Sequence, residues 1–343
     1  MFLEMSNKNS SMNNKSIEVL QLLRAVAAII VVMNHLLSES FGGVFKYIGG
    51  YGVNIFFVIS GFIMTYTAIN KNPVEFIFDR IIRIYPPYLI SSFVLIVISF
   101  FSFHKYLYFI VGNVLLLPGS DDGYRLANPV AWTLVYEMYF YIVFAFVLMM
   151  MPTRKYAALV CAMLLCSSVL IIKFLYPFTG KYNSLALHNI VQSYMIIQFA
   201  AGCVIGIYYE RISKFNMSQY TFLALSVILS VACFALIDLL PEADVSRYDI
   251  FYPFSILVVA LSLTVRKCSF TKLIYIGNAS YSIYLTHPYF NIALSRMGLL
   301  DSKSITIIAV IASIVVGVAF SRMVEIPITK YLKRKKTMKY ITS

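Results

Sequence analysis

Apolar residues recur along the chain in long stretches that short polar segments separate. A helix needs about 20 apolar residues to cross the roughly 30 Å of hydrocarbon in a bilayer, and most of the stretches have about that length. The pattern therefore predicts an all-α polytopic membrane helical bundle with about ten transmembrane helices. The predicted ranges are residues 17–38, 50–70, 84–102, 130–151, 156–176, 189–209, 219–239, 250–265, 273–295 and 304–326.

One further apolar run, residues 106–117, is only 12 residues long and ends at Pro118 and Gly119. A helix of that length is too short to cross a bilayer. Non-helical backbone at membrane depth must be buried in protein or line a cavity. We therefore interpret this run as one short re-entrant or interfacial helix.

Composition supports the membrane assignment. Hydrophobic residues make up 60% of the 343 residues and charged residues 13%, and the mean hydropathy is +0.80. This is more apolar surface than one water-soluble core buries. The chain divides into a disordered cytoplasmic N-terminus (1–16), a membrane domain (17–328) and a basic cytoplasmic tail (329–343). The polar loops are too short to fold independently, so any chemistry is expected inside the membrane domain.

Charge bias predicts the orientation, because cytoplasmic loops carry an excess of Lys and Arg. Of the 28 Lys and Arg residues, 18 fall on the side that holds both termini and 8 on the other, while Arg24 and Arg322 lie within helices. Both termini are therefore predicted to be cytoplasmic. Anionic lipid facing these loops accounts for most of the net charge of +13, so we expect no nucleic-acid partner.

Five cysteines, at positions 161, 166, 203, 233 and 268, lie within or beside the predicted spans. Their spacing matches neither a metal-ligand pattern nor an obvious pairing scheme. We expect free thiols and no metal site.

Charged residues inside the spans are the first candidates for function, because a charge in hydrocarbon is costly and usually faces a cavity or a partner. Arg24 and His35 lie in the first span, 11 residues apart. That separation is about 20° more than three full turns, so both side chains share one helix face, about 16 Å apart along the axis. The shared face favours function over a purely structural histidine.

A second candidate is the pair Arg80 and Arg83, in "FDRIIRIYPPY". Residues at i and i+3 project from the same side of a helix. The pair has two interpretations. It is either a cytoplasmic anchor of the kind that loop charge bias produces, or a forked clamp for phosphate, which suits guanidinium geometry.

Two further segments place polar and aromatic groups in spans. "NPVAWTLVYEMYFYIVF" contains Trp132, Tyr136 and Glu137, and "GNASYSIYLTHPYF" contains Tyr284 and His287. Trp132 fits an interfacial aromatic belt equally well, whereas an unpaired Glu137 in hydrocarbon would be costly. We expect His35, Glu137 and His287 at comparable depth in the outer half, with the three arginines on the inner side.

Taken in order, "LQLLRAVAAIIVVMNH", "GGYGVNIFFVISGFIM", "FDRIIRIYPPY", "WTLVYEMYFY", "ASYSIYLTHP" and "VEIPI" resemble the acyltransferase 3 family of integral membrane acyltransferases. The resemblance runs from about residue 17 to 328 and is strongest to exopolysaccharide and O-antigen (lipopolysaccharide) O-acetyltransferases. It implies a multi-pass enzyme of the bacterial inner membrane. Such an enzyme moves acetyl, or a similar group such as succinyl, from acyl-CoA to a hydroxyl of a surface or secreted polysaccharide or its lipid-linked precursor.

The resemblance also implies residue roles. Arg24 and His35 match the family's essential first-helix pair, and Arg80 and Arg83 match its proposed donor-binding arginines. Many members have an acidic residue where this chain has Asn54. Any role of that acid would therefore be absent here, or Glu137 or Glu39 would supply it.

The residues and the resemblance together suggest a mechanism. The three arginines would hold the phosphates of acetyl-CoA, and His35 would act as general base on a sugar hydroxyl or accept the acyl group as a nucleophile. Glu137 would orient the imidazole. Trp132, Tyr136, Tyr284 and His287 would line the pocket for the glycan acceptor.

Two alternatives remain open. A polysaccharide-precursor or small-molecule transporter, or flippase, would use the buried charges as a translocation path, although the sequence contains no inverted repeat. A serine acyl-enzyme at Ser60 is disfavoured, because Ser-Gly in a span usually permits close helix packing. The sequence indicates no oligomeric state.

Overall fold

The computed structural model describes residues 13–68, 72–103, 107–119, 126–151, 153–175, 187–239 and 249–341. Within these ranges the regular structure is helical, apart from one isolated backbone bridge between Met217 and Val265. The predicted all-α class is confirmed. Residues 1–12 of the predicted N-terminal segment lie outside the described ranges.

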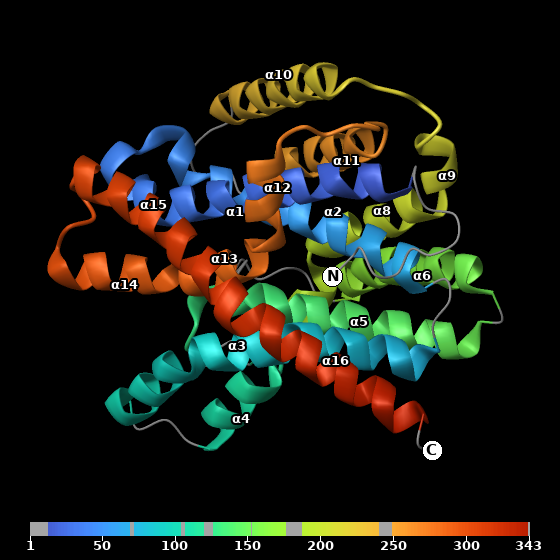
Figure 1. Cartoon of the computed structure of the whole chain (residues 1–343), viewed down its shortest axis with the longest axis horizontal. Helices are drawn as coiled ribbons and strands as arrows, with labels where there is room; N and C mark the ends of the chain where they lie inside the picture. The colour runs from blue at the N-terminus through green and yellow to red at the C-terminus, as the bar shows by residue number, and fades with distance from the viewer. Residues whose placement is uncertain are drawn as a thin grey trace.

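The helices form one bundle with short connections (Figure 1). Turns of 3-10 helix precede α2 (Gly43–Lys46) and α5 (Pro129–Ala131), and a π-helical turn, η5 (Ser321–Glu325), follows α15. The α-helices are α1 (Asn13–Phe41), α2 (Ile48–Ala68), α3 (Pro73–Phe103), α4 (Leu107–Leu115), α5 (Trp132–Met150), α6 (Arg154–Leu175), α7 (Leu187–Gln192), α8 (Met195–Ile207), α9 (Tyr209–Ile212), α10 (Gln219–Asp238), α11 (Phe251–Ser262), α12 (Thr271–Asn278), α13 (Ser280–Thr286), α14 (Pro288–Met297), α15 (Lys303–Phe320) and α16 (Ile326–Ile341).

Among the described residues, seven helices are long and apolar enough to cross a membrane. They lie in α1, α2, α3, α5, α6, α10 and the continuous run from α15 into α16. This agrees with a polytopic helical bundle. The count of ten crossings and the cytoplasmic position of both termini stay predictions.

The predicted span 273–295 is not one helix. It consists of α12, α13 and α14, with breaks at Ala279 and at His287. The second break lies just before Pro288, whose ring lacks the N–H that a continuing helix needs and which suits the first position of a new helix. The predicted span 189–209 is likewise divided, into α7 and α8.

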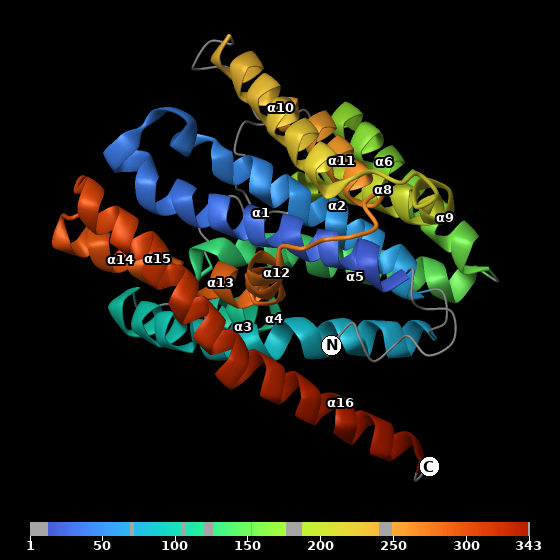
Figure 2. The same ribbon diagram turned by 45° about the horizontal axis from the view of Figure 1, so that its top comes forward.

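Helical structure extends beyond both predicted boundaries of the membrane domain, residues 17 and 328. α1 begins at Asn13, and α16 carries the chain as helix to Ile341, across the predicted start of the tail at residue 329. The turn η5 lies just before Pro327, which cannot donate the α-helical hydrogen bond to the carbonyl of Met323. Figure 2 shows α16 running past α3 and ending beyond the rest of the bundle, on the side opposite α10.

The centre of the bundle is the packing of α2 against α1 and α8, with α6 on the other side of α8. The two glycines Gly61 and Gly202 bring α2 and α8 into direct backbone contact. A Cβ on Gly61 would overlap the carbonyl oxygen of Phe199, and a Cβ on Gly202 would overlap that of Val58. Small residues at such crossings are typical of helix packing in membranes.

We expect Gly61→Ala to lower the free energy of unfolding by about 1–3 kcal/mol, since the methyl group must push two backbones apart. The measurement is the apparent melting temperature of the purified protein in detergent. Val204→Ala is the control, because Val204 lies exposed on α8. A Gly61→Ala protein that melts with the wild type would contradict the close approach.

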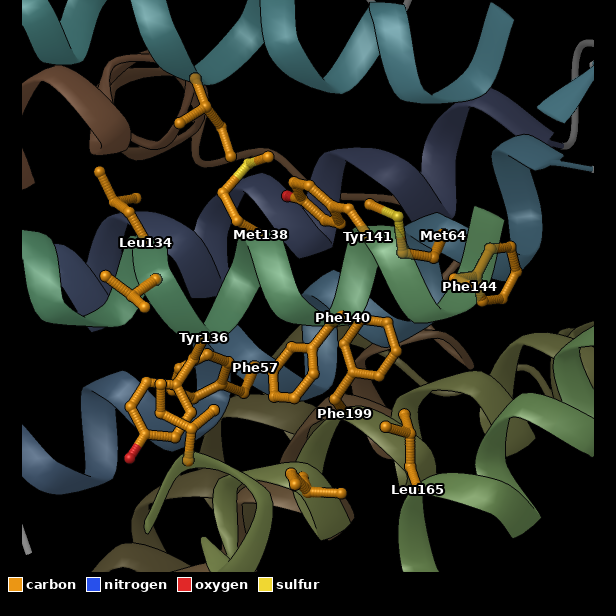
Figure 3. Close-up of a cluster of buried hydrophobic side chains, with 14 of the residues drawn as sticks. Phe57, Met64, Leu134, Tyr136, Met138, Phe140, Tyr141, Phe144, Leu165 and Phe199 are labelled. Atoms are coloured by element: carbon orange, nitrogen blue, oxygen red, sulfur yellow. The ribbon is translucent and has the colours of Figure 1, made fainter. Parts of the chain in front are cut away.

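α5 presents different side chains to the two sides of this core (Figure 3). Tyr136 and Phe140 point toward Phe57 and Phe199, and the rings of Phe140 and Phe199 stack with centroids 4.5 Å apart. Met138 and Tyr141 point toward the opposite side of the helix. The two sides of α5 therefore face different neighbours, and this division also separates the two cavities described next.

Candidate active site

Six charged side chains from α1, α3, α5 and α16 line a cavity inside the bundle, which we call the arginine cavity. Four of them are cationic and two are acidic, so the wall is positive. Guanidinium groups make paired, charge-assisted hydrogen bonds to phosphate, and the wall therefore suits an anionic, phosphate-bearing ligand. The six residues are Arg24, Arg80, Arg83, Lys333, Asp79 and Glu137.

The three arginines converge here from two helices. Arg80 and Arg83 are three residues apart on α3 and share one face, whereas Arg24 reaches the cavity from α1. Arg80 is buried, donates from Nη2 to Thr67 Oγ1 at 3.2 Å and lies 5.5 Å from the ring centre of Phe76. Arg83 is only half-buried. Arg83 is therefore the more accessible partner for a ligand.

The structure places Glu137 with the arginines, not with His35. Its carboxylate accepts a hydrogen bond of 3.0 Å from the Tyr141 hydroxyl and interacts electrostatically with all three guanidinium groups. Glu137 is part of the wall described for the arginine cavity, whereas His35 is part of the wall of a second cavity. The expected placement of Glu137 beside the imidazole is thus replaced by a place among the cations.

Helix periodicity explains this placement. Leu134, Glu137 and Tyr141, spaced i, i+3 and i+7 along α5, all line the arginine cavity, as residues on one helical face do. Trp132 and Tyr136, at i and i+4, line the second cavity. Because consecutive residues are turned by about 100°, Glu137 and its neighbour Tyr136 point in different directions.

A second buried carboxylate, Glu325, lies near the arginines. It comes from the π-helical turn η5, and its Oε2 accepts hydrogen bonds from Ser282 Oγ at 2.5 Å and from Ser321 Oγ at 3.1 Å. Arg24 interacts with it electrostatically. Glu325 thus ties α13 to the end of α15 and supplies negative charge near Arg24. The sequence motif "VEIPI", which contains Glu325, resembles the family but predicts no role for this residue.

The second cavity has a volume of about 650 Å³, and we call it the histidine cavity. That volume is in the range of pockets that bind small molecules. His35 is exposed and is part of its wall, which also carries aromatic and amide side chains together with Lys46, Lys173 and Asp249. Glu39 is exposed and is not part of either described cavity wall. The wall includes His35, Asn54, Trp132, Tyr136, Gln192 and Tyr284.

His287 lies behind His35 and is not part of the wall described for either cavity. The two rings have centroids 5.1 Å apart, and His287 is 0% exposed. Its Nδ1 is 3.3 Å from the carbonyl oxygen of Ile283, and its Nε2 has no hydrogen-bond partner among the described residues. The sequence predicts the two histidines at comparable depth, and in the structure their rings are in contact, but His287 packs behind His35 instead of facing the cavity.

The two cavities adjoin, because Val53 of α2 and Tyr284 of α13 are part of both walls. Tyr284 is held firmly: its hydroxyl donates to the carbonyl of Val130 at 3.0 Å and bonds Thr133 Oγ1 at 2.9 Å. Its ring also contacts His287, with centroids 5.9 Å apart. A thin partition thus separates the cationic compartment from the one that His35 faces.

The predicted site residues fall into two groups in the structure. Arg24, Arg80, Arg83 and Glu137 line the arginine cavity, and His35, Trp132 and Tyr136 line the histidine cavity. The sequence predicts no site role for Tyr141 or Lys333, and for Gln192 it predicts a polar lining residue without a chemical role. Helix periodicity predicts Tyr141 on the same face of α5 as Glu137, four residues earlier. The positions of Lys333 and Gln192, in contrast, depend on how helices distant in sequence pack together.

Comparison with known proteins identifies the family of the chain. Residues 17–322 match the family model of acyltransferase 3, described as an acyltransferase domain. The chain therefore belongs to the acyltransferase 3 family, and it is a membrane acyltransferase. It is similar to the exopolysaccharide production protein ExoZ of Rhizobium meliloti (strain 1021), with 29% identity over 301 residues, which cover 82% of this chain and 90% of that protein. No solved structure matches the chain significantly.

Proposed function

We propose that the protein is an O-acyltransferase of the bacterial inner membrane. It moves acetyl, or a similarly small acyl group, from acyl-CoA to a hydroxyl of a surface or secreted polysaccharide or its lipid-linked precursor. The observation that carries this proposal is the pair of adjoining cavities, one lined by arginines and one faced by His35. In such a pair, an anionic donor can occupy the arginine cavity and a sugar acceptor the histidine cavity. The two substrates then meet where the cavities share Val53 and Tyr284.

The donor end is the arginine cavity. Arg83 and Arg80, with Arg24, hold the phosphate groups of acyl-CoA, because guanidinium groups bind phosphate in pairs of hydrogen bonds. Glu137 offsets part of the mutual repulsion of the three cations, because its negative charge attracts each of them. The acyl-bearing arm extends toward Val53 and Tyr284, where the two walls meet.

The chemistry takes place at His35. Its imidazole takes the proton from the sugar hydroxyl, and the hydroxyl oxygen attacks the thioester carbonyl carbon. An ester C–O bond forms, the C–S bond breaks, and the CoA thiolate leaves and takes the proton from the imidazolium. His287 packs against His35 and restricts the orientation of its ring. In the alternative route, His35 itself accepts the acyl group before the sugar does.

The acceptor class rests on two observations. The related protein is named for exopolysaccharide production, and most of the polar and aromatic side chains in the wall of the histidine cavity are aromatic or amide-bearing. Aromatic faces and amides are suited to sugar rings and their hydroxyl groups. Acetyl-CoA is the donor we favour, with succinyl-CoA as the nearest alternative.

The proposal is tested by mass spectrometry of the host's surface and secreted polysaccharides. Wild-type cells, cells lacking the gene and cells with His35→Ala are compared. We expect an ester-linked acyl mass to disappear in both altered strains while the amount and length of the glycan stay the same. Full acylation with less exported glycan would instead support a flippase and overturn the proposal.

A further inference from the structure

The α7–α8 segment contributes a buried amide to the histidine cavity. Gln192, the last residue of α7, is 2% exposed and is part of the cavity wall. Neither its side-chain oxygen nor its side-chain nitrogen has a hydrogen-bond partner among the described residues. A buried amide left in this state is costly, so the fold retains an unsatisfied donor and acceptor at the edge of a cavity.

The aromatic side chains of Trp132 and Tyr136 share the cavity wall with Gln192. Trp132 is half-buried in the same wall, with its ring edge-on to that of Tyr136 at a centroid distance of 5.7 Å. Ser193, the residue after Gln192, is part of the same wall. The amide and the two aromatic rings therefore belong to one cavity wall, in which the two rings contact each other directly.

We propose that Gln192 is a specificity-determining residue, which reads hydroxyl groups of the acceptor sugar while the ring of that sugar lies on Trp132. This inference rests on the proposed function. A side-chain amide both donates and accepts, so it matches hydroxyl groups, which do the same. A site that hydrogen-bonds a hydroxyl rejects sugars without it, because the buried polar atoms then stay unpaired.

Gln198 provides the contrast within the same segment. It is also buried, on α8, and it is not part of either described cavity wall. Its Oε1 accepts a 3.0 Å hydrogen bond from Ser255 Oγ, whereas its Nε2 has no partner among the described residues. Both glutamines are therefore buried, but only Gln192 of the two is part of the cavity wall. The pair forms a matched comparison.

The experiment uses the chain's single tryptophan as a reporter. Because Trp132 lies on the wall of the histidine cavity, its fluorescence should respond to a sugar bound there. The probe is an oligosaccharide mixture, prepared from the host's extracellular polysaccharide by partial hydrolysis and mild alkaline de-O-acylation. It is titrated into purified full-length wild type, Gln192→Met and Gln198→Met, without acyl-CoA.

We expect Gln192→Met to weaken binding of this probe about 10-fold, the effect of losing one or two hydrogen bonds to a neutral group, and Gln198→Met to leave it unchanged. Gln192→Asn keeps the amide on a shorter side chain, so its affinity for the probe should lie between those of wild type and Gln192→Met. This variant replaces Gln192→Met in the test if Gln192→Met does not fold. Equal affinity of Gln192→Met and wild type would overturn the inference, as would equal weakening by both methionine variants.

A second readout separates this inference from the proposed function. Each variant is supplied with radiolabelled acetyl-CoA or, in a parallel assay, radiolabelled succinyl-CoA, together with the same probe, and ester-linked label on the glycan is counted. Wild type that binds the probe but transfers no label would overturn the proposed function. Wild type that transfers label while Gln192→Met has an unchanged KM for the glycan would overturn only the role of Gln192.

Discussion

Replacing His35 with alanine is expected to lower the rate of acyl transfer by about 10²- to 10⁴-fold, the usual contribution of a general base. The expectation rests on the position of His35: it faces the histidine cavity, near the partition formed by Val53 and Tyr284. The arginine cavity is untouched by the change. The affinity for acetyl-CoA, measured by isothermal titration, should therefore stay at the wild-type value.

The fold should tolerate this substitution. The contact that anchors this turn of α1 to α14 runs from the Asn291 side-chain amide to the backbone carbonyl of His35, and alanine keeps that carbonyl. His188→Ala is the matched control, because His188 is exposed on α7 and is not part of either described cavity wall. Full transfer activity of His35→Ala at normal protein level would remove His35 from the mechanism.

The same residue distinguishes the two chemical routes. Without acceptor, an enzyme that uses His35 as nucleophile accumulates an acyl-imidazole, whereas a general base stays unmodified. Rapid quenching followed by mass spectrometry of the peptide that contains His35 separates the two. We expect an unmodified peptide, because His35 faces a cavity large enough to hold the acceptor beside it.

Arg83→Ala is expected to weaken acetyl-CoA binding by about 10- to 100-fold, since a hydrogen bond to a charged group contributes about 1.5–3 kcal/mol. Arg83 is the better test than Arg80. Arg80 bonds Thr67 and packs on Phe76, so its loss would disturb the contact between α2 and α3 as well as the ligand. Arg83 is half-buried at the cavity wall.

Two further variants serve as comparisons in the measurement of acetyl-CoA affinity. Arg83→Lys keeps the positive charge but loses the forked geometry, so an intermediate affinity is expected. Arg296→Ala removes an exposed arginine of α14 that is not part of either described cavity wall, and it should bind acetyl-CoA like the wild type. If Arg83→Ala bound acetyl-CoA with unchanged affinity, the arginine cavity would not be the phosphate site.

Local patterns in the sequence were sufficient for the helices and for the alignment of residues on one helix. The apolar runs predicted the long helices, because burying the backbone in hydrocarbon demands internal hydrogen bonding over about 20 residues. The spacing of Arg80 and Arg83 predicted one face of α3. Pro288 is also a local signal for the break at His287, but the apolar run continues across it, so hydrophobicity alone predicts one unbroken span.

The contacts between helices were decided by tertiary structure. Depth along each helix placed Glu137 level with His35, but the rotation of α5 about its axis turns Glu137 toward the arginines. That rotation follows from the packing of Phe140 on Phe57 and Phe199. His287 illustrates the same point, because its ring lies behind His35 and not on the cavity wall.

By itself, then, the sequence determined a membrane bundle with arginines and histidines at defined positions along its helices, since those follow from hydrophobicity and a local repeat. Only the tertiary structure decided which of these groups share a cavity, that the two cavities meet at Val53 and Tyr284, and that Gln192 joins one of them. The reason is physical. Such placements depend on the relative rotation and approach of helices distant in sequence, which side-chain packing across the whole bundle sets.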